Sequence, residues 1–126
     1  MLWTMWSPAW RFTESEFEET ARSFENPDFV ATVIHSYRHR YRTTAGDPAL
    51  EALEVRLAAK PVITVPAIVL HGTDDRIDPS SGSEGQEKQF LSSYERRLIG
   101  GAGHCLPAEN AEAVSRAIRD LVEAAG

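Results

Sequence analysis

Two segments of this chain end in polar side chains whose types could do chemistry together. VPAIVLHGTDDRIDP (65–79) carries Asp74 and Asp75, and RRLIGGAGHCLPAEN (96–110) carries His104. Each segment is an apolar run of strand type followed by a glycine-containing turn. A histidine that acts as a general base needs a partner that fixes its tautomer and orientation, and a carboxylate does this well. The two turns therefore offer the acid and the base of a nucleophile–histidine–acid triad, with the acid first in the chain.

The elements that must position these side chains follow a strand–helix–strand–helix pattern. PAIVLHG (66–72) is a continuous apolar run, typical of a strand buried on both faces of a parallel sheet. We predict a short helix over 84–92, a weaker strand over 95–101 and an amphipathic closing helix over 108–126. Functional groups gather at the carboxyl ends of parallel strands, where both polar turns lie. The inward side of the closing helix is predicted to hold Ala113, Val114, Ala117, Ile118 and Leu121.

Residues 1–60 are predicted to be helical throughout. Thr13 and Glu16 match a capping box that opens a first helix, and Asn26-Pro27 and Asp47-Pro48 open two more. The tract 58–66 is expected to be extended because its two prolines restrict the residues before them. The chain is thus divided into a helical part, 1–60, and an α/β part, 61–126. The second helix carries an apolar stripe made of Phe29, Val30, Val33, Ile34, Tyr37 and Tyr41.

Composition excludes several classes of function. The chain has 126 residues, the size of one ordinary domain, with 42% hydrophobic and 25% charged residues, as in globular proteins. Its net charge of −6 argues against nucleic-acid binding, which needs clustered Lys and Arg. No apolar run approaches the roughly 18 residues of a membrane-spanning helix. A single cysteine, Cys105, favours a reducing, cytoplasmic location. We expect neither a cofactor nor a metal.

The C-terminal half resembles the α/β-hydrolase family, in particular the cap-containing epoxide hydrolases and esterases. In that family the strand before the acid commonly reads P-x-[IVL]-[IVL]-x-G-x-x-D, which residues 66–75 fit, and the last strand leads into G-x-G-H, which residues 101–104 fit. The resemblance implies that Asp75 is the acid and His104 the base, with Asp74 as a fallback acid. It also implies that residues 1–60 are a portion of the family's helical cap and 61–126 the C-terminal part of its core.

One part of the family pattern has no counterpart in this sequence. The nucleophile of these enzymes lies in a G-x-S-x-G elbow, or in an equivalent with Asp or Cys. Gly82-Ser83-Glu84-Gly85 has glycines at the wrong spacing and no strand before it, so we interpret it as a flexible loop. The oxyanion-hole segment and most of the parallel sheet are absent as well. The sequence therefore predicts an α/β-hydrolase fragment that lacks the nucleophile segment.

Several other residues have a functional and a structural interpretation. Cys105 follows His104, but adjacent side chains on an extended turn diverge, which favours a packing role for the cysteine. The pair His35 and His39 has a spacing that could hold a metal, although the neighbouring arginines favour a solvated helix face. Tyr37 and Tyr41 could point from the cap into a substrate cleft, as in the epoxide hydrolases, or pack as core or interface aromatics.

Three hypotheses about function follow. The first is a hydrolase fragment that supplies the acid and histidine for cleavage of a small apolar ester, epoxide or similar bond, where the nucleophile would decide the reaction. The second is a non-catalytic binding or assembly module, in which an exposed sheet edge pairs with another copy or with an N-terminal partner chain. The third is an enzyme active by itself, which would need a nucleophile from among Ser80, Ser81 and Ser83.

Overall fold

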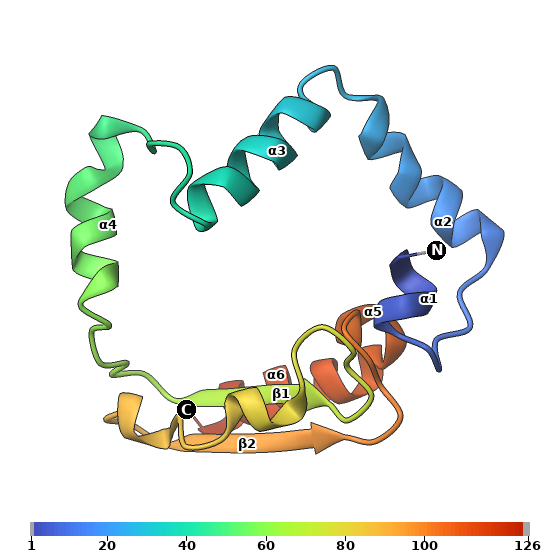
Figure 1. Ribbon diagram of the computed structural model, residues 1–126. Coiled ribbons are helices and arrows are strands. Elements are labelled where there is room, and N and C mark those ends of the chain that lie inside the picture. The colour runs from blue at the N-terminus through green and yellow to red at the C-terminus, as the bar shows by residue number, and fades with distance from the viewer. Residues whose placement is uncertain (1, 125–126) are drawn as a thin grey trace. The chain divides into compact units, whose positions relative to one another are not determined.

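The computed structural model describes residues 2–124. In it the chain forms helices and a small, two-stranded parallel sheet (Figure 1), as in a partial α/β fold. The chain forms two compact units. One contains Met1–Trp10 together with Pro61–Gly126, and the other contains Arg11–Lys60. A unit boundary lies near residue 60, where the sequence divides, but residues up to Trp10 group with the sheet and not with the helical unit. Within residues 2–124, no helix is long and apolar enough to cross a membrane.

The sheet consists of β1 (Ala67–Gly72) and β2 (Tyr94–Ile99), which run parallel from the pair Ala67–Tyr94 to the pair Gly72–Ile99. Both predicted strands are present. The second is shorter than predicted at its C-terminal end because the chain turns there, with Gly101 at a φ of +73° that favours glycine. The polar turns that follow the two strands both lie at the carboxyl end of the sheet.

The prediction of a short helix over 84–92 is wrong. The connection between the strands contains only two 3₁₀-helical turns, η3 (Ser80–Ser83) and η4 (Glu87–Gln89). Gly85 has a φ of +69°, which interrupts a right-handed helix. Phe90 is then drawn into an extended bridge with Ile63, because the N–H of Ile63 donates to Gln89 and the N–H of Leu91 donates to Ile63. This pairing with a distant segment overrides the local helical preference.

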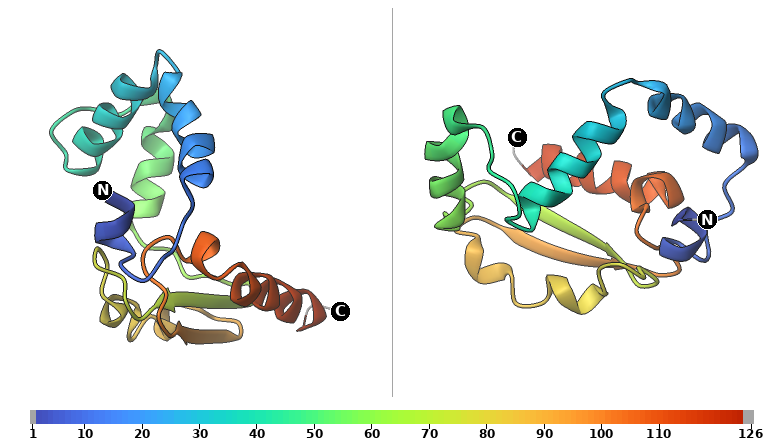
Figure 2. Two further views of the ribbon diagram at one scale, coloured as in Figure 1. Left: turned by 90° about the vertical axis from the view of Figure 1, so that its right-hand side faces the viewer. Right: turned by 45° about the horizontal axis from the view of Figure 1, so that its top comes forward.

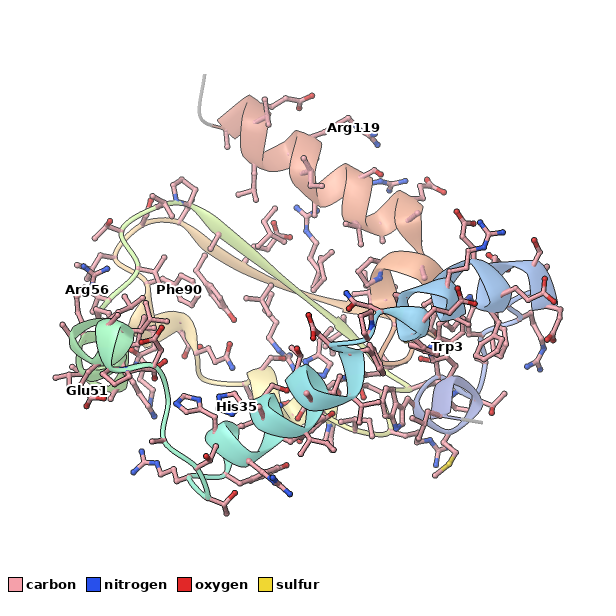
Figure 3. All side chains as sticks on the ribbon, turned by 90° about the horizontal axis from the view of Figure 1, so that it is seen from above. Trp3, His35, Glu51, Arg56, Phe90 and Arg119 are labelled. Carbon is pink, nitrogen blue, oxygen red and sulfur yellow. The ribbon has the colours of Figure 1, made fainter. Side chains whose placement is uncertain are left out.

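Two helices follow β2, namely α5 (Leu106–Glu109) and α6 (Ala111–Ala124). The strand β1 contacts α6 on one side of the sheet and η3 on the other (Figure 2). On the predicted inward side of α6, Ala117 is buried and the others are half-buried, but Ile118 is 57% exposed, so its predicted burial is wrong. Arg119 points away from the strands (Figure 3). Most of β1 is likewise half-buried and not fully buried, because a sheet of two strands leaves each strand an open edge.

The N-terminal residues belong to the same unit. A short helix, α1 (Leu2–Trp6), carries Trp3, labelled in Figure 3, whose ring stacks on Trp10 with centroids 4.8 Å apart. Ser7, directly after α1, is completely buried. The buried apolar residues Ala102, Leu106 and Ala117 all come from the C-terminal part of the unit. The core is therefore small, and buried polar contacts contribute to its organisation.

The helical unit contains α2 (Glu14–Ala21), the turn η1 (Arg22–Glu25), α3 (Phe29–Arg40), the turn η2 (Pro48–Leu50) and α4 (Glu51–Ala58). The three predicted helices are present. No side chain between Arg11 and Lys60 is buried, and the stripe on α3 is largely exposed, with Tyr41 at 69% and Val30 at 63%. The capping box opens α2 and the Asp47 side chain caps the turn η2, whereas α3 begins at Phe29 without a side-chain cap. The apolar stripe does not form a core within its unit.

The capping box at the start of α2 gives a testable prediction. The backbone N–H of Thr13 donates to the Glu16 carboxylate at 2.6 Å, and the N–H of Glu16 donates to the Thr13 hydroxyl at 3.2 Å. We expect Thr13→Ala to destabilise α2 by about 1 kcal/mol, because it removes the hydroxyl that accepts the N–H of Glu16 and donates to the Glu16 carboxylate at 2.8 Å. Amide exchange in α2 would measure the change. Thr20→Ala, within the same helix, is the control and should leave protection equal or slightly higher.

Candidate active site

The structure brings together two of the polar side chains that the sequence singles out. Nδ1 of His104 lies 3.0 Å from Oδ2 of Asp75, across the edge where β1 and β2 end. An ionised carboxylate can only accept, so Nδ1 carries the proton and the neutral ring presents Nε2 as its basic nitrogen. The Asp75 side chain is 8% exposed and that of His104 is 35% exposed. A largely buried carboxylate thus orients a histidine whose ring is partly open to solvent.

The turn after Asp75 holds its carboxylate. Oδ1 accepts the N–H groups of Ile77 at 2.8 Å and Asp78 at 2.9 Å, as in an Asx turn. Burial by itself would raise the pKa of Asp75. The two backbone N–H groups and the His104 ring together outweigh burial and hold the pKa below its ordinary value. The Asp75 carboxyl is therefore ionised at neutral pH, which is the state in which a carboxylate can orient a general base.

The neighbouring carboxylate, Asp74, has different partners. Its Oδ1 accepts the Thr73 hydroxyl at 3.1 Å, and its backbone N–H donates to the carbonyl of Ala102 at 2.9 Å. The hydrogen bond to His104 thus comes from Asp75, and the fallback acid does not take this position. The Thr73 hydroxyl also accepts the N–H of Gly101, so this pair of residues links the two turns structurally.

The loop that carries His104 is fixed by residues that sequence reasoning did not assign to the site. The Glu109 carboxylate accepts the N–H groups of Gly103 at 2.7 Å and Cys105 at 3.0 Å. The buried Ser7 hydroxyl also accepts the N–H of Cys105, at 3.1 Å. In the sequence, Glu109 lies in the first turn of the closing helix predicted over 108–126, where the helix dipole favours a carboxylate. In the structure Glu109 instead ends α5, before α6 begins at Ala111.

Trp6 links the two halves of the site. Its carbonyl accepts the backbone N–H groups of both Arg76 and His104, each at 3.3 Å. Its ring also meets the imidazole of His104 edge-on, with centroids 5.6 Å apart and an interplanar angle of 77°. Nothing in the local sequence around Trp6 indicates these contacts, because the partners lie far along the chain.

Cys105 is not suited to be a nucleophile in this structure. Burial is the largest influence on its thiol and raises the pKa of Cys105, while contact with Ser7 only partly offsets this. A thiol becomes reactive when its pKa is lowered, so the environment opposes a thiolate at neutral pH. The expected packing role of Cys105 agrees with this environment.

The other candidates lie in the helical unit. His35, labelled in Figure 3, and His39 stack with ring centroids 6.3 Å apart. Among residues 2–124, no group of three or more His, Cys, Asp or Glu side chains is arranged to hold a metal. Tyr37 is 51% and Tyr41 69% exposed, and their rings lie nearly parallel with centroids 6.5 Å apart. Neither tyrosine belongs to a core formed by its own unit.

The lowered pKa of Asp75 predicts how stability responds to pH. Its ionised form is favoured in the folded state, so the contribution is fully present above the unfolded pKa, near 3.8, and is lost as pH falls through the lower folded value. We expect Asp75→Asn to remove this contribution. Urea unfolding at pH 7 and near pH 3 would test this, since the stability difference between wild type and variant should shrink on acidification. A difference that grows at low pH would contradict the assignment.

Comparison with known proteins adds one similarity. No family model and no curated protein matches the chain. A crystal structure from Klebsiella pneumoniae subsp. pneumoniae MGH 78578, described as that of a "putative epoxide hydrolase", matches with a TM-score of 0.86 and 38% sequence identity over 95% of this chain. The chain is similar to part of that protein. It spans 40% of the length of the Klebsiella protein, so the similarity extends over a fragment of it.

Proposed function

We propose that this chain is the C-terminal portion of an α/β hydrolase, with a part of its helical cap before the core. In this proposal Asp75 and His104 are the acid and base of a nucleophile–histidine–acid triad. The observation that carries the proposal is the 3.0 Å contact between Asp75 Oδ2 and His104 Nδ1, together with the two backbone N–H groups that hold the acid. The likeness to a protein described as an epoxide hydrolase supports it.

The substrate we favour is a small apolar epoxide, with an ester as the alternative. In epoxide opening, a carboxylate nucleophile attacks a ring carbon and forms an ester with the enzyme, while the ring oxygen takes up a proton. Nε2 of His104 then removes a proton from water, which attacks that ester and releases the diol. Asp75 stabilises the resulting imidazolium through Nδ1–H. The nucleophile is proposed to come from outside these 126 residues.

Complementation tests this proposal. The purified chain would be assayed with styrene oxide and p-nitrophenyl acetate, alone and mixed with the N-terminal portion of a full-length relative. Turnover only in the mixture, abolished by His104→Ala, is the expected result. Turnover by the chain alone would indicate a nucleophile within it. Ser83 is an unsuitable one, since it is 4% exposed and its hydroxyl is hydrogen-bonded to Arg96.

A second candidate function is an assembly module, which one feature of the sheet unit favours. Leu98 on β2 is 48% exposed, and Ile118 and Val122 on α6 are 57% and 67% exposed. The two-stranded sheet also leaves each strand an open edge, at which a strand of another chain could pair. Light scattering over a hundredfold range of concentration separates the two functions. A particle mass that rises with concentration supports self-assembly, and a mass that stays at that of the monomer rules out the assembly function.

A further inference from the structure

We propose that His71 is a positioning residue for Asp75 and acts through the turn 75–78. His71 lies on β1, one residue before Gly72, and takes no part in the proposed proton transfer. The inference rests on the proposed function, because the role of Asp75 as the acid is itself a proposal. It concerns a different question, namely what keeps the carboxylate of Asp75 aimed at His104.

A short chain of hydrogen bonds connects His71 to the acid. Nε2 of His71 lies 2.7 Å from the carbonyl oxygen of Asp78. A carbonyl can only accept, so Nε2 carries a proton and donates it. The N–H of the same residue, Asp78, donates to Oδ1 of Asp75 at 2.9 Å, and the other oxygen of Asp75 meets His104. His71 thus holds the peptide segment that holds the acid.

The turn has little packing that could replace this anchor. Ile77 is 47% exposed and Asp78 is exposed as well. Besides the contact of Asp75 with His104, a longer bond from the N–H of Arg76 to the Trp6 carbonyl, at 3.3 Å, also connects the turn to the rest of the unit. Where side chains are not buried, hydrogen bonds must define the backbone position, and the bond from His71 to the Asp78 carbonyl is the shortest of these three contacts, at 2.7 Å.

The ring of His71 is itself held in place by polar contacts. Its Nδ1 lies 3.0 Å from the hydroxyl of Ser83, which is buried and accepts a hydrogen bond from Nε of Arg96 at 2.8 Å. In the neutral ring, the proton on Nε2 makes Nδ1 an acceptor, so Ser83 donates to it. When Nδ1 is protonated, the hydroxyl can instead donate to the carbonyl of Ser80, 3.0 Å away. Both arrangements leave the Nε2 proton directed at Asp78.

Packing alone does not explain the orientation of His71. Its ring lines a hollow of about 360 Å³ together with Val69, Asp78, Gly82, Ser83 and Gln86. The contacts at the two ring nitrogens therefore define the orientation of the ring beside this hollow. Functional side chains are commonly held in place by neighbouring residues whose own rotamers are fixed by hydrogen bonds.

Two amide substitutions distinguish the roles of the two ring nitrogens of His71. In His71→Gln the amide nitrogen can reach the place of Nε2 and keep the bond to Asp78, whereas in His71→Asn the amide reaches only the place of Nδ1. The readout is ¹³C NMR titration of the Asp75 carboxyl in the full chain, with circular dichroism to check folding. We expect His71→Gln to keep the lowered pKa of Asp75 and His71→Asn to raise it toward the ordinary value. Equal behaviour of the two folded variants would overturn the proposal.

A measurement on the unchanged protein covers the case in which a variant does not fold. The ¹⁵N spectrum of His71 at neutral pH should show Nε2 protonated, with a scalar coupling across the hydrogen bond to the Asp78 carbonyl. A ring whose Nε2 is unprotonated would overturn the inference directly.

The complemented enzyme gives an independent readout. There we expect His71→Asn to lower kcat by about 10- to 100-fold with KM little changed, and His71→Gln to stay within a few-fold of wild type. An enzyme that is active but equally affected by both substitutions would overturn the positioning role. If no mixture is active, the proposed function fails, while the titration and the ¹⁵N spectrum still decide the role of His71.

Discussion

Replacing Asp75 by Asn is expected to lower the turnover of the complemented hydrolase by about 10⁴-fold while the chain remains folded. The Asn oxygen can still accept the N–H groups of Ile77 and Asp78, which directs its NH₂ group at Nδ1 of His104. An NH₂ group can only donate, so the ring must place its proton on Nε2. The nitrogen that should take up a proton from water is then already protonated, and the base is lost.

The neighbouring carboxylate supplies a matched control. Asp74→Asn makes the same change in charge one residue away, on a side chain that contacts Thr73 and not His104. We expect its kcat to stay within about twofold of wild type, since it removes no interaction with the reacting groups. Steady-state kinetics of both variants in the mixture provide the comparison. Equal losses would show that charge at this turn, and not the orientation of His104, sets the rate.

The largest effect on stability is expected from Gly72→Ala. A Cβ at this position would lie 2.3 Å from the carbonyl oxygen of Ala102 and 2.6 Å from that of Gly103. Both are backbone atoms of the loop that precedes His104, so no flexible side chain can move aside. We expect a loss of about 3 kcal/mol or more in the free energy of unfolding, because either β1 or the loop must shift. Urea denaturation followed by tryptophan fluorescence would measure it.

Gly82→Ala is the control for this substitution. A Cβ at Gly82 meets no atom within 4 Å, and its φ lies outside the positive region. The change in the free energy of unfolding should stay within about 0.5 kcal/mol. If Gly72→Ala proved as mild as Gly82→Ala, the close approach of β1 to the loop would not exist in solution.

The sequence predicted the elements whose signals are local. An apolar run bounded by proline and glycine defined β1, and the capping box of Thr13 and Glu16 defined the start of α2. The helix expected over 84–92 failed because Phe90 pairs with Ile63, a partner that no window around residue 90 contains. Periodicity describes a segment by itself and does not show which other segment will compete for it.

Burial was predicted less well than secondary structure. Ile118 has the right spacing for an inward position, yet it is exposed, because spacing selects a helix face without showing what covers it. The site shows the same contrast. The types and order of Asp75 and His104 were sufficient to pair them, whereas the supports from Trp6 and Ser7 come from the opposite end of the chain and leave no local pattern.

The contact between Ser7 and Cys105 has a consequence for the time course of folding. These residues are 98 positions apart, so the hydrogen bond between them closes a loop of most of the chain. Contacts of such high sequence separation form late, because the entropy of closing the loop must be lost before the contact stabilises anything. On the ribosome, the segment 2–10 must wait until the turn around His104 has emerged. We therefore expect the histidine loop to be among the last parts of the chain to reach its final geometry.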